Sequence, residues 1–575
     1  MKNYNVILLI LASVFICSTC SDSFLDKSTE GNIGQEALIS EEGVTMLTTA
    51  AYANMTENNW GASIMNWTFG GMYGGDANKG SDPGDQNILN EMELYQTSTT
   101  NGYIADKWNW VYAGVGRCNE VLKIIPQVDG LNESVGNTRA AEVRFLRALH
   151  YYEGIKVFGV FIPWIDETIT EPNPKVHNNI DITEKVIADL DFAATNLPAI
   201  PDLPGRANSW AAKTLKAYLL MQVGRNGEAL PILEDVVNNG VNSKGDAYGL
   251  MDNINDNFSV ATENNKEAVF SIQFSVDAPD NSNSGISLAY PHNSGPGGCC
   301  GFYQPSFELA NSFQVDVDGL PYLDDAYRDF KSVTEWGGDL SINNYAIAVD
   351  PRLDIAIGRY DIPYKDWGLP NSNWVRNPSN GGCFFPKKHV FSKAEQENGY
   401  KGLPLGWSPG SALNYEYMRV ADVYLRYAEC LAEAGKLSNA MEYVNRVRAR
   451  AANTVNFVTR EDGSYAANYQ IEIYPNGHEA FSNKETCVKA IRFERKLELA
   501  MEGHRWFDLA RWGGDYMSQE LSEYVKYESD FIAKFSTAQT LSPNRTNFPL
   551  PQAQIDILGK DENGEAYLKQ NEAWN

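Results

Sequence analysis

The sequence predicts a mainly α-helical fold, in which helix pairs form a scaffold that carries a large, loop-rich region with short strands. Apolar residues recur with helical spacing in two blocks, mainly at 33–240 and 415–515. Between them, residues 241–414 are rich in Gly, Pro, Asn, Asp and Trp and show few helical patterns. Because a structureless loop of that length is uncommon inside a compact domain, we expect this irregular region to fold against the helices.

Helical patterns of the first block are clearest in "TRAAEVRFLRALHYYEGIKVFG", where Phe145, Leu149 and Tyr152 share one face. "SWAAKTLKAYLLMQVG" starts at Ser209, a capping residue, and "GEALPILEDVVNNG" follows as its antiparallel neighbour. The second block holds "VADVYLRYAECLAEAG", which ends at Gly435, and then "NAMEYVNRVRARA", "KETCVKAIRFERKLELAMEG" and "HRWFDLARWGG". Helix pairs of about 34 residues with short turns resemble tetratricopeptide repeats.

The overall charge of the chain limits its partners. The chain has 575 residues and a formal net charge of −27 at pH 7. Nucleic acids and anionic membrane surfaces bind positively charged proteins, so neither is an expected partner. Hydrophobic residues make up 43% of the chain, which is typical of a folded globular protein.

The N-terminus has the pattern of a secretory signal peptide. Lys2 gives a positive start, and "VILLILASVFI" at 6–16 is shorter than the roughly 20 residues that span a bilayer. The C-x-x-C of Cys17 and Cys20 follows directly, where a signal peptidase cleaves. We therefore expect a lipoprotein signal at 1–19, and a lipid on Cys20 as the first residue of a mature domain at 20–575. The alternative is ordinary secretion with cleavage nearby.

Several segments together resemble the SusD/RagB family, the starch-binding outer-membrane lipoproteins of Bacteroidetes. They are "EVRFLRALHYYEGIKVFGVFIPWI" (142–165), "WAAKTLKAYLLMQVG" (210–224), "MRVADVYLRYAECLAEAGKLSNAMEYVNRVRARA" (418–451), "IRFERKLELAMEGHRWFDLARWG" (491–513) and "NFPLPQAQID" (547–556). "KWNWVYAGVGRCNEVL" (107–122) and "DPRLD" (350–354) also fit. These segments follow the order of the family and span the whole mature chain.

The resemblance implies a SusD-like helical scaffold, a lipid anchor on the outer face of the outer membrane, and a glycan ligand. It also implies docking, as a lid over the barrel, onto a SusC-type TonB-dependent transporter that receives the captured oligosaccharide. We expect no enzymatic activity and no cofactor. Two alternatives stay open: a peptide-binding member of the family, because a fold does not determine its ligand, and a secreted glycoside hydrolase.

Two motifs suggest hydrolysis, but each has a structural explanation. In "RFERKLELAMEGHRWFDLARW" an Arg lies within four residues of every acid. A neighbouring Arg lowers a carboxyl pKa, whereas the general acid of a glycosidase needs a raised one. We expect an ion-pair network between helices that involves Glu494, Glu498, Glu502 and Asp508. In "GWSPG" at 406–410, Pro409 follows Ser408 and lacks the N–H that an oxyanion hole needs.

The polar loop "GGDANKGSDPGDQ" at 74–86 is a candidate for a structural calcium ion. Asp76, Asn78, Asp82 and Asp85 offer the hard oxygen ligands that Ca²⁺ prefers. The spacing departs from an EF-hand, which has Glu at its twelfth position. We favour hydrogen bonds from this loop to sugar hydroxyls, or Asx turns within it. The sequence contains no motif for a catalytic metal.

Aromatic residues of the irregular segments, among them Trp60 and Trp407, carry the functional prediction. A flat ring covers the apolar C–H face of a sugar, while Asp, Asn and Arg pair with its hydroxyls. The family builds its ligand site from loops outside the helix pairs. In this chain, such loops contain Trp67, Tyr73, Asp76, Asn78, Tyr303, Trp336, Trp367 and Trp374. We expect three or four of these to converge on one exposed site; the alternative for each Trp is a packing role.

The adjacent residues Cys299 and Cys300 raise a redox question. Their Cα atoms are about 3.8 Å apart across a trans peptide, below the usual disulfide range of about 4.4–6.8 Å. A bond between them is strained, yet an oxidising compartment permits it. Cys383, in the similar segment "NGGCFF", is a competing partner. A vicinal disulfide, a bond to Cys383 and free thiols all stay open.

The lipid anchor can be tested by substitution in the intact precursor. Cys20→Ala should release the protein from membranes because it removes the residue that carries the lipid. Cys17→Ala is the matched control and should leave the protein bound, since Cys17 lies in the cleaved peptide. Membrane fractionation followed by immunoblotting measures both; retention of both variants with the membranes would contradict the lipid anchor.

Overall fold

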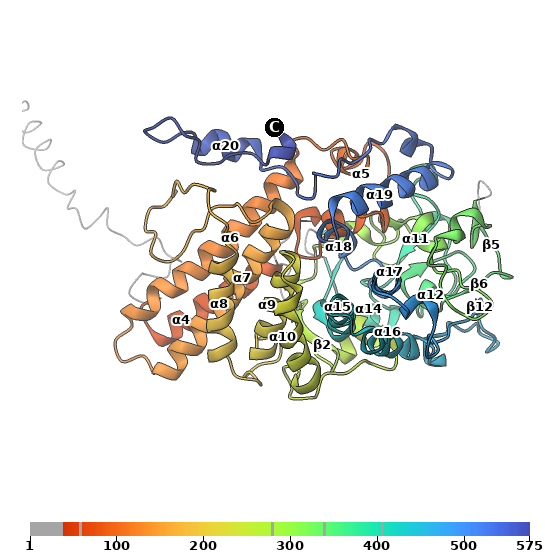
Figure 1. The fold of residues 1–575 in the computed structure, drawn as a ribbon, viewed down its shortest axis with the longest axis horizontal. Coiled ribbons are helices and arrows are strands. Elements are labelled where there is room, and N and C mark those ends of the chain that lie inside the picture. The colour runs from red at the N-terminus through yellow and green to blue at the C-terminus, as the bar shows by residue number, and fades with distance from the viewer. Residues whose placement is uncertain (1–37, 57–59, 278–280, 337–340, 404–405) are drawn as a thin grey trace, which may run out of the picture.

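The computed structural model describes residues 38–56, 60–277, 281–336, 341–403 and 406–575. Cys20 and the expected signal peptide lie outside these residues. The described chain is mainly helical, as predicted, and its strands are short (Figure 1). No helix within it is long and apolar enough to span a bilayer.

The first block of helices forms a stack in which each long helix packs against the next (Figure 1). An asparagine caps three of these helices: the side chain of Asn101 accepts from Tyr103 N, that of Asn132 from Ser134 N, and that of Asn208 from Ala211 N. Asn208, rather than the predicted Ser209, is therefore the cap of its helix. The helices are α4 (Glu41–Ala53), α6 (Gly102–Ile124), α7 (Glu133–Phe158), α8 (Thr183–Asn196), α9 (Ser209–Gln222) and α10 (Asn226–Asn239).

The second block continues the stack, because its first helix packs against α10 although the irregular region separates the two in sequence. Side chains on every face of this first helix, α15, are buried from Val420 to Ala432, so it forms the centre of the stack. The helices of this block are α15 (Val420–Glu433), α16 (Leu437–Ala451), α17 (Lys484–Glu498), α18 (Arg505–Arg511) and α19 (Gly514–Ser529).

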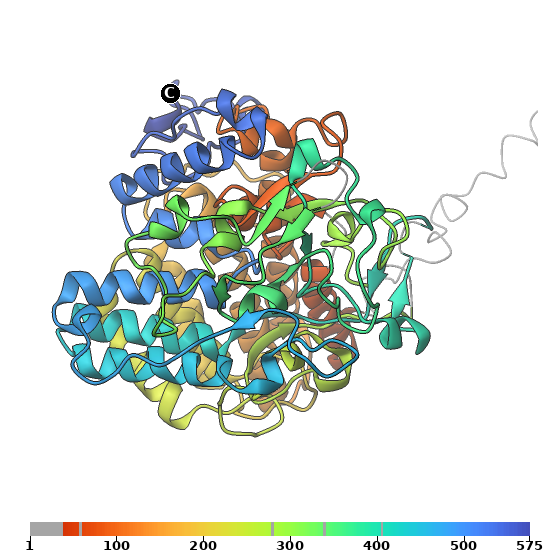
Figure 2. The ribbon, with the colours of Figure 1, turned by 90° about the vertical axis from the view of Figure 1, so that its right-hand side faces the viewer.

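The remaining elements are short and belong mostly to the irregular region, which faces the viewer in Figure 2. The helices are α5 (Leu89–Glu93), α11 (Phe307–Asn311), α12 (Arg352–Ala356), α13 (Pro378–Gly381), α14 (Lys393–Glu397) and α20 (Gln552–Leu558). The strands are β1 (Ala77–Gly80), β2 (Ala268–Ile272), β3 (Phe302–Pro305), β4 (Thr334–Trp336), β5 (Ser341–Asn343), β6 (Ala348–Val349), β7 (Ile357–Gly358), β8 (Phe385–Pro386), β9 (Lys401–Gly402), β10 (Gly410–Ser411), β11 (Tyr415–Arg419) and β12 (Asn468–Tyr469).

Short strand pairs connect distant segments. β1 pairs antiparallel with β3, with Asn78 opposite Gln304, so the loop after α4 joins the irregular region. β2 pairs antiparallel with β11, with Tyr415 opposite Ile272, and β11 leads directly into α15. β9 and β10 form a small hairpin in which Gly410 lies opposite Gly402. The strands therefore connect segments and form no continuous sheet among the described residues.

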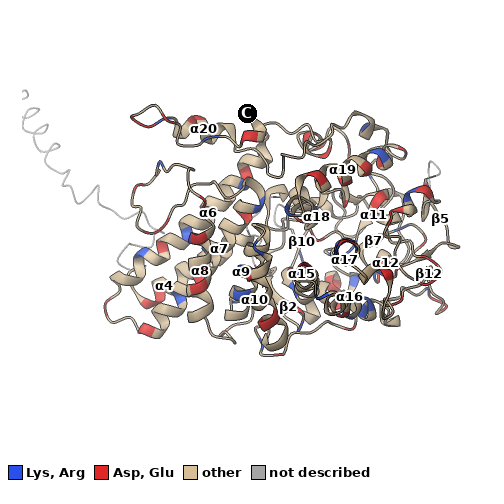
Figure 3. Cartoon of the chain, in the orientation of Figure 1, with Lys and Arg blue, Asp and Glu red and all other residues tan. Residues whose placement is uncertain are grey.

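A buried network of ion pairs confirms the structural interpretation of the acidic motif. Arg419 Nη1 lies 2.7 Å from Glu498 Oε1, and Arg419 Nε lies 2.7 Å from Glu502 Oε2. Lys388 of the irregular region also contacts Glu502, at 2.6 Å. Burial alone would raise the pKa of Glu502, but Arg419 and Lys388 outweigh it and lower the pKa to about 2. Figure 3 shows acidic and basic residues close together around α17.

Candidate functional site

The structure contradicts the expectation that the predicted ligand residues line an exposed site. Burial leaves at most 5% of the surface of most of them exposed, so their side chains cannot contact a glycan directly. The buried residues are Trp67, Tyr73, Asp76, Asn78, Tyr303 and Trp374. Trp367 is half-buried, and Trp336 lies in β4, where only its backbone is described.

Trp67 packs inside the molecule because the glycines near it admit close contacts. Its ring lies 5.7 Å from the ring of Tyr303, and its Nε1 donates to the carbonyl of Gly285 at 3.1 Å. A Cβ on Gly71 would lie 2.0 Å from the Tyr303 hydroxyl, so only glycine fits there. The glycine-rich context that suggested an exposed Trp instead permits dense packing around it.

The loop after α4 contacts the C-terminal helices through three of the predicted ligand residues, Tyr73, Asp76 and Asn78. The rings of Tyr73 and Trp506 lie 4.7 Å apart. Asn78 Nδ2 donates to the carboxyl of Glu528 at 2.7 Å, and the Tyr524 hydroxyl donates to Asn78 Oδ1 at 3.0 Å. The polar side chain of Asn78 therefore forms hydrogen bonds with buried side chains rather than with a ligand.

Trp374 and Trp367 support the irregular region. The ring of Trp374 lies 5.3 Å from Tyr364 and 5.7 Å from Phe385. Trp367 Nε1 donates to the carbonyl of Phe391 at 3.1 Å. Both residues thus have the packing role that was the alternative for each Trp.

In the loop at 74–86, which was a candidate for a calcium ion, the ammonium group of Lys79 occupies the centre. Lys79 Nζ donates to the carbonyls of Asp82, Pro83 and Asp85 at 3.0, 3.2 and 2.8 Å. The carboxylates of Asp82 and Asp85 pair instead with Arg376, each at 2.6 Å. Within the described chain, no group of three or more His, Cys, Asp or Glu residues is arranged to hold a metal ion.

A pair of tryptophans, the exposed Trp407 and the half-buried Trp60, lies where two distant segments meet. Trp407, in the turn of the β9–β10 hairpin, is 56% exposed, and its ring lies 6.2 Å from that of Trp60 in an edge-on contact. Tyr400 and Leu403 of the same hairpin are 40% and 50% exposed. Sequence reasoning placed Trp60 and Trp407 among the loop aromatics but did not select them, because nothing local distinguishes an exposed Trp from a packed one.

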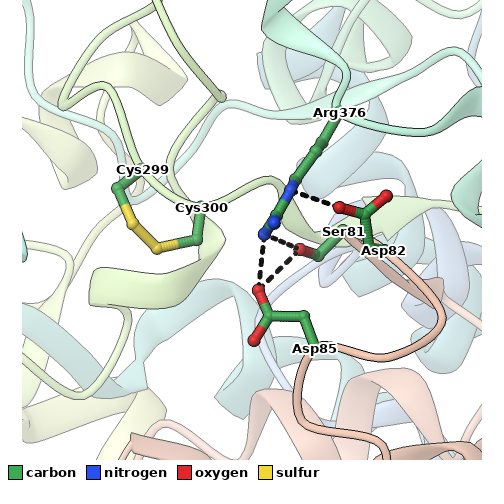
Figure 4. The surroundings of a disulfide bond; sticks show 6 residues. All are labelled: Ser81, Asp82, Asp85, Cys299, Cys300 and Arg376. Carbon is green, nitrogen blue, oxygen red and sulfur yellow. Dashed lines mark hydrogen bonds and ion pairs between the residues drawn. A yellow bond between two sulfur atoms is a disulfide. The ribbon is translucent and has the colours of Figure 1, made fainter.

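The loop at 291–301, here called the disulfide loop, packs against Pro409, two residues after Trp407. Cys299 and Cys300 form a disulfide with each other, and the peptide between them is cis. The vicinal bond is therefore the correct alternative, and the buried Cys383 takes no part in it. Figure 4 shows this disulfide with Arg376, Ser81, Asp82 and Asp85.

The two motifs that suggested hydrolysis both have structural roles. Ser408 of the "GWSPG" motif is fully buried. Glu498 and Asp508 are paired with arginines, which hold the pKa of each carboxyl below its ordinary value although burial opposes the shift. A buried, ionised carboxylate with arginine partners is unsuited to act as a general acid.

Comparison with known proteins identifies the family. A model of the SusD family matches residues 266–574, more than half of the chain. The chain belongs to the SusD family. A second model, described as starch-binding and associating with the outer membrane, matches residues 23–219. The SusD family is a family of glycan-binding proteins associated with the outer membrane.

Individual SusD-like proteins match along nearly their whole length. SusD-like protein P25 of Formosa agariphila is 25% identical over 597 residues, covering 97% of each chain. A SusD superfamily protein of Bacteroides vulgatus has a crystal structure with a TM-score of 0.67 at 18% identity, covering 93% of this chain and 99% of that one. Surface glycan-binding protein A of Bacteroides thetaiotaomicron, solved with laminarihexaose, has a TM-score of 0.62 at 18% identity and covers 92% and 99%.

The buried position of Asp76 predicts a pH effect on stability rather than on binding. Burial raises the pKa of its carboxyl to about 7, although Arg505 opposes the shift. The unfolded carboxyl has a pKa of about 3.9, so the stabilisation that the folded state gains from holding this proton is lost as pH rises from about 4 to 7.

Asp76→Asn removes this titration and can still accept the hydrogen bond from Met501 N. The advantage of the wild type over the variant in melting temperature should therefore shrink between pH 5 and pH 8, with glycan affinity unchanged. Thermal melts at both pH values measure it; an equal difference at the two would contradict the raised pKa.

Proposed function

We propose that this SusD-family protein is a cell-surface lipoprotein that captures oligosaccharides and delivers them to a SusC-type TonB-dependent transporter in the outer membrane. The observation that supports glycan capture is the surface pair formed by the exposed Trp407 and the half-buried Trp60. Contiguous apolar patches rimmed by polar residues mark ligand-binding or interaction sites on protein surfaces.

The pair has the chemistry that a sugar ring requires. An aromatic side chain offers about 150–250 Å² of contact area, and burial contributes about 25 cal/mol per Å². Two such rings supply useful affinity even after the cost of ordering a flexible ligand. Tyr400 and Leu403 extend the apolar surface along the same hairpin.

The two alternative functions have weaker support. A peptide ligand would suit the same fold, but no feature of the described surface favours a peptide over a sugar. The acidic motif that suggested hydrolysis does not supply a general acid, since Glu498 and Asp508 are buried and paired with arginines. Laminarihexaose in the related surface glycan-binding protein A supports a glycan ligand.

Removal of the exposed ring tests glycan capture. Trp407→Ala should lower affinity about thirtyfold, equivalent to about 2 kcal/mol, because it removes most of the contact area on one sugar. Its melting temperature should change little, since more than half of this side chain is already in water. Calorimetry on neutral oligosaccharides that the wild type binds, with thermal melts alongside, measures both quantities.

Trp210→Ala is the matched control for this experiment. Trp210 lies on α9, is partly exposed, and contacts Lys213, whose Nζ is 4.1 Å from the ring centroid. This variant should keep wild-type affinity. Equal affinity of the Trp407 variant and the wild type would place the glycan elsewhere on the molecule.

The partner prediction is tested in cells that produce both proteins. The mature lipoprotein should co-purify in mild detergent with a large β-barrel transporter encoded nearby. The Trp407→Ala variant should co-purify equally well, because one side chain contributes only a small part of a stable protein–protein interface. Recovery of the wild-type protein as a free monomer under these conditions would contradict the transporter role.

A further inference from the structure

The disulfide loop connects the tryptophan pair with an ionic cluster made of Asp82, Asp85 and Arg376. At one end, Gly297 packs so closely on Pro409, two residues after Trp407, that an added Cβ would lie 3.1 Å from the proline ring. At the other end, the carbonyl of Gly301 accepts a hydrogen bond from Ser81 N at 2.6 Å. The tryptophan pair, the disulfide loop and the ionic cluster therefore follow one another along one region of the molecule.

Backbone hydrogen bonds hold the disulfide loop against this region. Cys300 N donates to the carbonyl of Leu288 at 3.2 Å, and Gly301 N donates to that of Tyr290 at 2.9 Å. His292 N donates to the carbonyl of Trp374, two residues before Arg376, at 2.8 Å. The position of the disulfide is thus tied to that of the ionic cluster, and a Cβ on Gly301 would lie 3.6 Å from Arg376 Cβ.

One of the two cysteines of the disulfide is accessible to solvent. Cys299 is half-buried, whereas Cys300 is only 7% exposed, so it is mainly Cys299 that reaches the surface. Sulfur is polarizable and carries no charge in a disulfide, and it contacts apolar groups well. The exposed part of the bond can therefore cover the C–H face of a sugar in the way that a small apolar side chain does.

The ionic cluster holds a guanidinium in one orientation at the surface. Arg376 Nε pairs with Asp82, and its Nη1 with Asp85 and with Ser81 Oγ, at 2.6, 2.6 and 3.1 Å. Within the described chain, Nη2 of Arg376 makes no hydrogen bond. About a third of each side chain is exposed: 34% for Arg376, 39% for Asp82 and 30% for Asp85. The cluster thus offers fixed donors and acceptors together (Figure 4).

We propose that the Cys299–Cys300 disulfide and the Asp82–Asp85–Arg376 cluster form a second subsite for an uncharged oligosaccharide whose first sugar contacts Trp60 and Trp407. This inference rests on the proposed glycan capture. The disulfide contacts the apolar face of a further sugar, and the cluster binds its hydroxyls. Lys79 is fully buried beneath the cluster, so the surface that faces a ligand presents two carboxylates and one guanidinium. This surface therefore repels the carboxylate or sulfate groups of acidic sugars.

The experiment compares short and long neutral oligosaccharides. The probes are glucan, xylan, mannan and galactan oligosaccharides of two and six sugars, with oligogalacturonides of the same lengths as the charged arm. Arg376→Gln, and separately Cys299→Ser with Cys300→Ser, should each lower hexasaccharide affinity about tenfold, the size of one lost charge-assisted contact or apolar surface. Disaccharide affinity should stay unchanged, whereas Trp407→Ala should lower affinity for both lengths.

A protection assay distinguishes ligand contact from a purely structural role of the disulfide. A saturating wild-type hexasaccharide should slow reduction of Cys299–Cys300 by a soluble phosphine several-fold, as measured by mass spectrometry after alkylation. A hexasaccharide that the wild type does not bind is the control. This readout needs no variant, so it decides the question even if the double serine variant fails to fold.

The outcomes separate this inference from the proposed function. Unchanged hexasaccharide affinity in the variants, together with unprotected reduction, would overturn the second subsite while leaving glycan capture intact. Equal affinity for oligogalacturonides and neutral hexasaccharides would overturn the uncharged ligand class. A wild type that binds no oligosaccharide of the panel would overturn both proposals.

Discussion

The arrangement of the whole chain depends on the buried ion pairs around Arg419. This residue ends β11 and reaches Glu498 of α17, Glu502 beyond it, and Glu267 before β2. Breaking a buried pair costs about 3–5 kcal/mol, because the remaining charge stays buried without a partner. The network therefore specifies how the irregular region, which contributes Lys388, lies on the second block of helices.

Aromatic residues of the loops form two groups, one buried in the interior and one at the surface. Only the tertiary structure shows to which group each residue belongs. Trp67 and Tyr73 fill the interface between the loop after α4, the irregular region and the C-terminal helices. Glycine is essential to this packing, since a Cβ on Gly70 would lie 1.7 Å from the carbonyl oxygen of Gly503. Trp60 and Trp407 come from segments that meet at the surface, where Trp407 is exposed and Trp60 is half-buried.

The proposed glycan surface is assembled from segments that no single part of the chain contains. Trp60 follows α4, the disulfide loop follows β2, and Arg376 and Trp407 come from two later loops. Each segment is held by backbone hydrogen bonds or by short strand pairs rather than by a large sheet. A rigid helical stack with irregular loops between its two blocks allows the ligand surface to vary while the scaffold is kept.

The sequence by itself determined the helices, the family and the buried acid network, because these depend on local periodicity and on charges a few residues apart. It also narrowed the state of Cys299 to a bond with Cys300, a bond with Cys383, or a free thiol. Only the tertiary structure decided that the disulfide is vicinal, that Trp67 is buried and that Trp407 is exposed. An aromatic side chain in a glycine-rich segment packs or protrudes according to partners hundreds of residues away, such as Gly285 for Trp67, and local sequence carries no signal for such contacts.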